Sequence, residues 1–260
     1  AGVVRIKTGD HSEKFLAISN DCNNRYCYLD PYRGAQIAFA ECARNLACTG
    51  ARPIGLTDNL NFGNPHKPEA FYMLKECVKG LADACTYFDV PVSGGNVSLY
   101  NENPDGPIDP TPTVSILGLI NQPEHIPTRW IKEDANAILL IGGLPTELGG
   151  SYYIQVEHGL KDGAPPELDL AHEQKIHNWL INEIESGKIA SAHDLSEGGL
   201  LVALTEMLFS TEQTHGAEIS LPEPPENSRI DEVLYGESQG RILVACDASH
   251  TDSILASAKA

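Results

Sequence analysis

Apolar and polar residues alternate along this chain in segments of two lengths, which predict strands and helices in turn. The helical segments carry apolar residues at steps of three and four, whereas the strand segments are short and continuously apolar. Their alternation predicts an α/β or α+β fold. Strands are expected at 3–6, 15–18, 54–57, 90–93, 114–120, 137–141 and 242–245, and helices at 34–47, 68–88, 170–185 and 200–209.

The clearest predicted helix covers residues 68–88. Pro68 suits its first turn, where a missing N–H group costs little. Apolar or small residues recur at steps of three and four, so they share one face that we expect to cover a sheet. These residues are Phe71, Leu74, Val78, Leu81, Cys85 and Phe88.

A polar segment with two prolines at 121–127 indicates a domain boundary. We therefore expect an N-terminal domain at 1–121 and a C-terminal domain at 122–260. A chain of 260 residues is long enough for two such domains with real cores.

Charge narrows the classes of partner. The chain has 18 Lys and Arg against 36 Asp and Glu, for a net charge of −18. Such a surface repels a phosphate backbone, so we expect no nucleic acid partner. A small nucleotide is still compatible, because backbone amides, helix N-termini and Mg²⁺ can hold its phosphates. No apolar run has the length of a membrane span, so no membrane association is expected.

Seven cysteines occur, with no C-x-x-C pair. This pattern supports neither a zinc site nor a disulfide framework. Cys77 and Cys85 fall within a helical pattern, as buried small residues would. The N-terminus has no secretory signal pattern, and a reducing cytoplasm is the simplest location.

The strongest local feature begins with two glycines after a predicted strand. Gly94 and Gly95 would let the backbone approach a ligand closely. Asn96 offers a neutral oxygen for a hard cation, and Ser98 offers a hydroxyl. Taken alone, the same residues also fit an ordinary turn.

A second polar segment, 58–69, follows the predicted strand 54–57 and leads into the long helix. Loops at the ends of strands are where α/β folds bind ligands, although a solvated loop with a helix cap would look similar. One helix separates the strands 54–57 and 90–93, so they should be neighbours in one sheet. We therefore expect Asp58 and Asn96 to lie close together.

A third candidate is the segment 193–199, which opens a helix and has N–H groups that suit an anion. His193 and Asp194 should point in opposite directions on a strand, which argues against a catalytic dyad and favours helix capping. Glu237–Gln239, before a late strand, is polar enough for a site but also fits a surface turn.

Together these segments resemble one family, the synthetase subunit of phosphoribosylformylglycinamidine synthase, in its second half. Each motif is weak alone, but the ordered set is specific and covers essentially the whole chain. The motifs are Asp58-Asn59-Leu60-Asn61-Phe62-Gly63-Asn64-Pro65, Lys67-Pro68-Glu69, Gly94 to Glu102, Pro110-Thr111-Pro112-Thr113, Ala192 to Leu200 and Gly236 to Gln239.

The resemblance implies a fold shared with aminoimidazole ribonucleotide synthetase. The full synthase would contain two such units, whose N-terminal domains pair to close a barrel with ATP bound across the pairing. It would convert formylglycinamide ribonucleotide, ATP and ammonia into formylglycinamidine ribonucleotide, ADP and phosphate. A glutaminase subunit or domain would supply the ammonia, and the second domain of this chain would stop short of its full length.

The resemblance also assigns roles to residues. Asp58 and Gly95 would contact ATP, Asn96 would ligate Mg²⁺, and Ser98 would contact the substrate. The first half of the family carries a Thr-His-Asn-His stretch, where this chain has 21–25 without a histidine. No catalytic residue is therefore assigned to this half, and the segments 193–199 and 237–239 are expected to be structural or to bind a nucleotide without turnover.

Two other interpretations stay open at this point. One is a self-contained kinase-like enzyme of the same superfamily, and the other is a nucleotide-binding or scaffold domain without catalysis. As half of a synthase, the chain should be inactive alone, and its unpaired N-terminal domain should self-associate into a homodimer.

Overall fold

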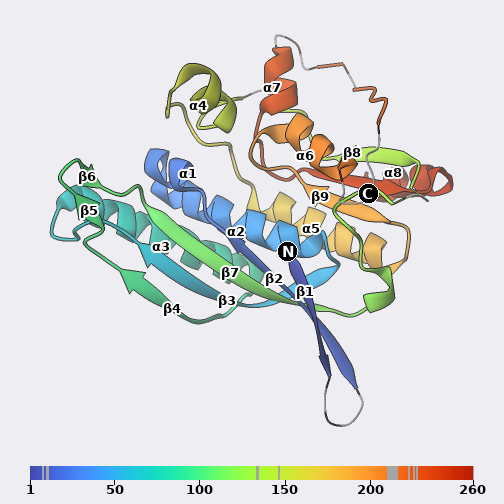
Figure 1. The fold of residues 1–260 in the computed structure, drawn as a ribbon, viewed down its shortest axis with the longest axis horizontal. Helices are drawn as coiled ribbons and strands as arrows, with labels where there is room; N and C mark the ends of the chain where they lie inside the picture. The colour runs from blue at the N-terminus through green and yellow to red at the C-terminus, as the bar shows by residue number, and fades with distance from the viewer. Residues whose placement is uncertain are drawn as a thin grey trace.

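The chain folds into two α/β units, each built on its own sheet (Figure 1). The first sheet ends at Ile120 and the second begins at Ala137. This confirms the mixed α/β architecture, while the boundary at residue 121 stays a prediction. The computed structural model describes residues 1–7, 9, 12–132, 135–145, 147–209, 216–221, 223–224, 226 and 228–259.

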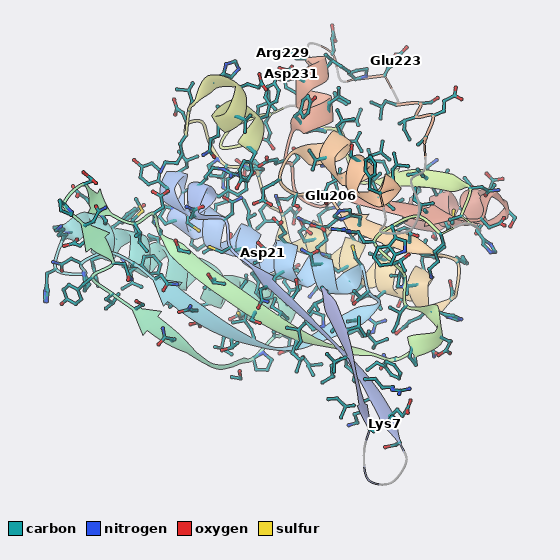
Figure 2. The ribbon with its side chains drawn as sticks, in the orientation of Figure 1. Lys7, Asp21, Glu206, Glu223, Arg229 and Asp231 are labelled. Atoms are coloured by element: carbon teal, nitrogen blue, oxygen red, sulfur yellow. The ribbon has the colours of Figure 1, made fainter. Side chains whose placement is uncertain are left out.

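The N-terminal sheet has five strands in the order β1-β2-β7-β3-β4. Strands β3 and β4 are parallel, and the other neighbours are antiparallel. Across the described residues this sheet is open, with β1 and β4 at its edges. The far end of β1, at Lys7, protrudes from the molecule (Figure 2). The strands are β1 (Gly2–Lys7), β2 (Glu13–Asp21), β3 (Ala51–Asn61), β4 (Val92–Ser98) and β7 (Thr111–Ile120).

Helices cover one face of this sheet. α2 (Pro31–Ala47) packs on β2, β7 and β3, and α3 (Pro68–Phe88) lies beside it (Figure 1). Strand β7 shows the consequence, because its side chains alternate between buried and half-buried along its whole length. Val114 and Ile116 point into the core under the helices. In the part of the chain that the structure describes, no helix covers the opposite face, which we call the open face.

The predicted buried face of α3 is partly wrong. Phe71 and Val78 are 52% and 43% exposed. The other four predicted members are buried or half-buried in the core, and these are Leu74, Leu81, Cys85 and Phe88.

Small residues explain the difference. Cys77, Gly80 and Ala84 are buried on the side of α3 that meets α2. A Cβ atom at Gly80 would lie 2.2 Å from the carbonyl oxygen of Tyr32, so the two helices approach too closely for a larger residue. A pattern based on large apolar side chains misses such a contact, because close helix packing selects for small ones.

A short helix that the sequence pattern did not predict precedes α2. α1 (Asn24–Leu29) begins after Asn23, whose side-chain oxygen accepts the N–H of Tyr26 at 3.0 Å. Asp30 then caps α2 in the same way, accepting the N–H of Arg33 at 3.0 Å. Polar residues here serve as consecutive helix caps.

The C-terminal unit has a three-stranded antiparallel sheet in the order β8-β10-β9. Every residue of β10 is buried, because helices lie on both of its sides. The strands are β8 (Ala137–Ile141), β9 (Ser191–Asp194) and β10 (Ile242–Cys246). The helices are α4 (Tyr152–His158), α5 (Leu170–Glu185), α6 (Gly199–Leu208), α7 (Ile230–Tyr235) and α8 (Thr251–Ala258). Shorter elements are β5 (Glu102–Asn103), β6 (Gly106–Pro107), η1 (Pro123–His125) and η2 (Ala248–His250).

The two units share a core where α2 meets α5. Ala47 and Cys48, at the end of α2, are buried in the same cluster as Ile181 and Ile184 of α5. The first unit therefore inserts the end of a helix into the second, which fixes how the two sheets lie relative to each other.

Candidate functional site

Strands β3 and β4 bring the two predicted binding segments together. In their parallel register Asp58 lies opposite Gly95, and Asn59 lies opposite Asn96. Asp58 and Asn96 are thus one position apart on neighbouring strands, as expected from the strand–helix–strand order. Both strands are longer than predicted, so these residues lie within the sheet and not in loops beyond it.

The pleat of the sheet points Asp58 and Asn96 to opposite faces. Asp58 lies opposite the buried Val114 of β7, which places it on the face that the helices cover. Burial raises the pKa of this carboxyl group. A Cβ atom at Gly95 would lie 2.3 Å from Asp58 Oδ1, so only glycine fits beside it. The single site that we expected is therefore divided between the two faces of the sheet, on the neighbouring strands β3 and β4.

The open face of the sheet carries a row of neutral amides and hydroxyls. Asn96 Nδ2 donates to Asn59 Oδ1 at 3.0 Å, and Thr57 Oγ1 donates to the carbonyl of Gly94 at 2.9 Å. These groups keep further donors and lone pairs for a ligand. The strand registers place the members of this polar row on one face, and they are Thr57, Asn59, Asn61, Asn96, Ser98, Thr113 and Ser115.

Ser98 has a fixed position at the end of the polar row. Asn101 Nδ2 donates to the carbonyl of Ser98 at 2.9 Å and to that of Phe62 at 3.1 Å. The oxygen of the same side-chain amide, Asn101 Oδ1, accepts a hydrogen bond from the Ser98 hydroxyl at 3.2 Å. Asn101 therefore ties the end of β4 to the end of β3 and orients the serine.

The open face becomes apolar toward β1. Ile18 of β2 is 42% exposed and lies opposite Leu117 of β7. Val4 of β1 is 51% exposed and lies opposite Leu16. An uncovered apolar area next to a polar row is typical of an interaction surface.

A buried polar junction joins the two units around Glu237, which is 2% exposed. Its Oε1 accepts the backbone N–H groups of Tyr152 at 2.8 Å and of Gly198 at 2.9 Å. Its Oε2 accepts the hydroxyl of Tyr26 and lies 3.6 Å from the Arg25 guanidinium. The surface turn considered for Glu237–Gln239 is therefore wrong.

This geometry also corrects the expectation for 193–199. The N–H of Gly198 binds the carboxylate of Glu237, so the anion at the start of α6 belongs to the chain itself. No side chain of this segment caps the helix. We predicted that a residue of the segment itself would cap α6. Instead, Glu237 from a distant part of the chain accepts the N–H of Gly198 at the start of this helix.

Arg44 forms the second part of the junction and is fully buried. Its Nη1 lies 2.6 Å from Glu173 Oε1, and its Nη2 donates to Gln239 Oε1 at 3.0 Å. Burial alone would raise the pKa of Glu173, but the Arg44 charge and the hydrogen bond from His177 outweigh it and lower the pKa to about 2. Glu173 is therefore a permanent anion that holds α5 against α2.

Further carboxyl groups lie near Arg44. Burial, then the nearby Asp194 and Glu197, raise the pKa of Asp21 well above its usual value, and burial with Asp21 does the same for Glu41. Asp21, labelled in Figure 2, is the last residue of β2. Among the described residues, no three His, Cys, Asp or Glu side chains are arranged to hold a metal ion.

His193 contacts two carboxylates, contrary to the expectation that it would point away from Asp194. Its Nδ1 lies 3.3 Å from Asp194 Oδ1, and its Nε2 lies 2.7 Å from Glu206 Oε2. Burial lowers the pKa of His193, but these carboxylates raise it more. The imidazole links β9 to α6, and no nucleophile contacts it in the described part of the chain.

All seven cysteines are free thiols. None of the helices in the described ranges is both long and apolar enough to cross a membrane.

An open five-stranded sheet backed by helices and followed by a second α/β unit defines the class of this protein. Residues 1–120 match the N-terminal domain of the AIR synthase related proteins, and residues 134–260 match the C-terminal domain. The chain belongs to this family.

Within the family, the chain is similar to phosphoribosylformylglycinamidine synthase subunit PurL. It is 48% identical to that of Anaeromyxobacter sp. (strain Fw109-5), across 94% of this chain and 33% of the relative. It is 45% identical to that of Thermoanaerobacter sp. (strain X514), across 98% of this chain and 34% of the relative. The chain thus spans about a third of the length of these relatives.

Solved structures agree on the fold. T. maritima PurL complexed with FGAR superposes with a TM-score of 0.74 at 20% identity, covering 95% of this chain and 40% of that one. The hydrogenase maturation protein HypE superposes with a TM-score of 0.65 at 17% identity, covering 94% and 75%. At these identities the likeness concerns the fold alone.

Proposed function

We propose that this chain is the second half of a phosphoribosylformylglycinamidine synthase, an ATP-dependent C–N ligase of purine synthesis. Identity of 45–48% to PurL subunits along nearly the whole chain supports this assignment. The structural observation that carries it is the polar row on the open face, because a site of this kind is incomplete without a partner. The free thiols fit a reducing compartment such as the cytoplasm.

The open sheet is completed by the equivalent domain of the N-terminal half. Two edge strands, β1 and β4, are available for pairing, and the apolar end of the open face gives the partner an area to bury. Pairing of this kind would close a barrel. It would also place the polar row opposite the segment that carries the histidines of the other half.

Each candidate residue has a role in this complex. Asp58 and Gly95 contact ATP at the β4 edge of the sheet, and Ser98 orients formylglycinamide ribonucleotide on the open face beside it. Asn96 donates through Nδ2 to Asn59, so its Oδ1 is the atom that suits a cation. One amide oxygen fits Mg²⁺ as part of a shell that phosphates and the other half would complete.

The reaction needs alignment more than acid or base chemistry from this half. ATP transfers its terminal phosphoryl group to the amide oxygen of the substrate, ammonia then adds to the same carbon, and phosphate leaves. Mg²⁺, when bound, neutralises charge on the phosphates. The polar row holds the substrate amide in place, and burial under the paired sheet excludes water. A glutaminase partner supplies the ammonia.

The test is an assay with ATP, formylglycinamide ribonucleotide and ammonium, with and without the N-terminal half of the synthase. The chain alone should form no formylglycinamidine ribonucleotide, because it has no histidine at 21–25. Addition of the N-terminal half should restore product. Steady ADP formation by the chain alone that depends on the substrate would contradict the proposal.

A further inference from the structure

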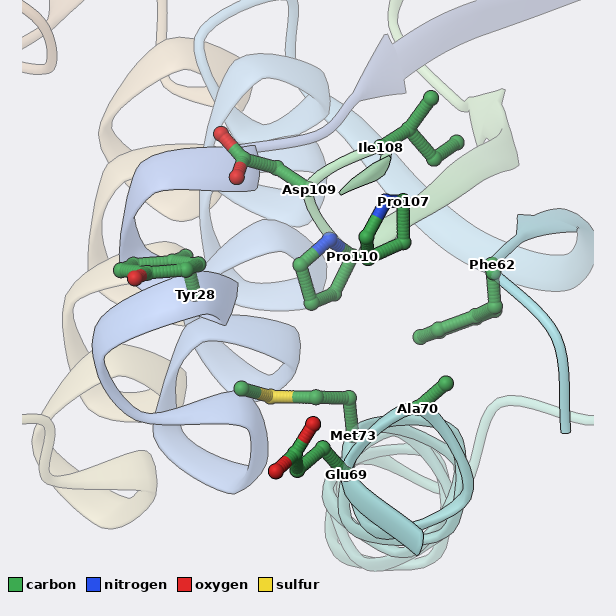
Figure 3. A pocket seen from close by; sticks show the side chains of 10 residues that line it. Tyr28, Phe62, Glu69, Ala70, Met73, Pro107, Ile108, Asp109 and Pro110 are labelled. Atoms are coloured by element: carbon green, nitrogen blue, oxygen red, sulfur yellow. The ribbon is translucent and has the colours of Figure 1, made fainter. Parts of the chain in front are cut away.

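A cavity lies just past the end of β3, on the helix-covered side of the sheet. It has a volume of about 290 Å³, close to the lower limit of small-molecule sites. Figure 3 shows Glu69 and Met73 on α3 facing Tyr28 on α1, with Phe62 and Pro110 on the remaining sides. The walls therefore come from four separate parts of the N-terminal unit, which are α1, the end of β3, α3 and the segment 107–110.

The cavity has a rigid, mainly apolar frame. Phe62 is 2% exposed and forms one wall. The backbone beside it is held by Asn101, whose Nδ2 donates to the Phe62 carbonyl at 3.1 Å. A Cβ atom at Gly63 would lie 2.7 Å from Pro107 Cβ, so glycine allows the β6 segment to close over this wall. The shape is thus formed before any ligand arrives.

Two carboxylates lie at the rim, and they differ in availability. Asp109 is neutralised by Lys161, whose Nζ lies 2.8 Å from Oδ1 and also sits 3.7 Å from the centre of the Tyr28 ring. Glu69, in the first turn of α3, has no ion pair or side-chain hydrogen bond to another described residue. Glu69 is therefore the charge that a ligand would meet.

We propose that this cavity binds a small aromatic amine. A flat ring fits against Phe62, Met73 and Pro110, which offer apolar and polarisable surfaces. The protonated amino group would lie at Glu69. The unneutralised Glu69 and a net charge of −18 oppose phosphates at this position, so the ligand differs from the nucleotide of the proposed reaction.

The cavity is separate from the residues assigned to ATP. Phe62 follows Asp58 by four positions, just past the end of β3, which corresponds to about 13 Å of extended chain. Binding in the cavity is measured on the chain alone, which should form no product, so its outcome does not depend on the synthase reaction.

The two methionines of the chain allow a direct measurement. Met73 lines the cavity, whereas Met207 is fully buried in the C-terminal unit. We would label the methionine methyl groups with ¹³C and titrate the purified chain with tryptamine, a ring of suitable size with a protonated amine. The Met73 signal should shift in a saturable way, with a Kd of about a millimolar for about 12 non-hydrogen atoms. The Met207 signal should not move.

Matched variants test the site and the role of charge. Ala70→Leu fills the cavity and should abolish the shift, while Ala82→Leu, on the exposed side of the same helix, should leave it intact. Glu69→Gln should weaken tryptamine binding by about two- to fivefold but leave the neutral analogue tryptophol unchanged. Glu157→Gln is the charge control.

Several outcomes would overturn the proposal. One is a Met73 signal that does not saturate, and another is an equal shift of both methionines. Binding that survives Ala70→Leu would show that the ligand lies elsewhere. Equal affinity for tryptamine and tryptophol in the unmodified chain would refute the role of Glu69.

Discussion

Neutral side chains dominate the candidate site, so its chemistry depends on direction more than on charge. Asn96 and Ser98 project from the same face of β4, and neither titrates in the physiological range. Asp58, the carboxylate assigned to this site, lies on the opposite face. Single residues in this half are thus suited to positioning a nucleotide and a substrate.

Replacing Asn96 tests this role in the intact synthase. Asn96→Ala should lower kcat/KM for Mg²⁺-ATP by about tenfold or more, because it removes an oxygen that contacts a charged ligand. The melting temperature should not change, since Asn96 is exposed and belongs to no core. Steady-state kinetics and thermal unfolding measure the two effects. Asn121→Ala, another exposed asparagine, is the matched control, and an equal kinetic loss there would refute the assignment.

The residues of the buried junction show what a local pattern cannot reveal. Glu237 stood out as part of a polar segment, but its partners Arg25 and Tyr26 come from more than 200 positions earlier. Arg44 lies in an alanine-rich helix, and a charge in such a stretch is a signal that could have indicated a buried ion pair. Its partner Glu173 had no such signal.

Among the secondary-structure elements, α3 shows how packing distance changes a helical face. Periodicity located the helix correctly, and its start at Pro68 agrees with the prediction. The helix is rotated about its axis relative to the prediction, because Gly80 and its small neighbours make the contact with α2. The large residues Phe71 and Val78 consequently turn toward the surface.

Two substitutions on α3 test this orientation. Leu81→Ala should lower the free energy of unfolding by about 2–5 kcal/mol, because it opens a cavity in the core. Val78→Ala, one turn earlier and 43% exposed, should change it by less than about 0.5 kcal/mol. Urea denaturation of both variants measures the difference. Similar losses at the two positions would show that Val78 is buried.

For the whole molecule, the junction predicts an unusual dependence of stability on pH. Asp21, Glu41 and His193 have raised pKa values in the folded chain. The folded state therefore binds their protons more tightly than the unfolded state, and the stability that they contribute is lost as the pH rises through the folded pKa values. Glu173 behaves in the opposite way, because its pKa is lowered from 4.5 to about 2.

The melting temperature should accordingly rise as the pH is lowered from about 8 to about 5. The melting temperature should fall again below the ordinary glutamate pKa of 4.5. Between this pH and about 2, protonation removes the stability that the ionised Glu173 contributes to the folded state. Thermal unfolding followed by circular dichroism across this range measures the curve. Glu41→Gln should reduce the dependence of the melting temperature on pH between about 5 and 8. A monotonic increase in stability from pH 5 to pH 8 would contradict the prediction.

The open sheet face leads to a prediction about assembly. The isolated chain should form a homodimer through this face, because the N-terminal half that we propose as its partner is absent. Ile18→Lys places a charge in the apolar area and should shift the equilibrium to monomer by at least about tenfold in Kd. Val156→Lys, at a position 73% exposed on α4, should have no effect. Analytical ultracentrifugation distinguishes these outcomes, and a strict monomer at high concentration would contradict the prediction.

Periodicity, turn residues and ordered motifs were sufficient to predict the α/β class, most strands and helices, and the closeness of Asp58 to the strand of Asn96. These features depend on neighbours along the chain and on the short connection between two parallel strands. The faces of the sheet were decided only by tertiary structure. Asp58 points to the helices because β7 pairs beside it and extends β3 past its expected end.

The junction between the units likewise depended on the fold. Buried charges need partners that satisfy them, and those partners can come from any element that the topology brings near. For Glu237 these are Tyr26, Arg25 and two backbone N–H groups. The local sequence shows that a residue is polar. Its side chain loses water, and so needs a hydrogen-bond partner, only when two distant segments pack together.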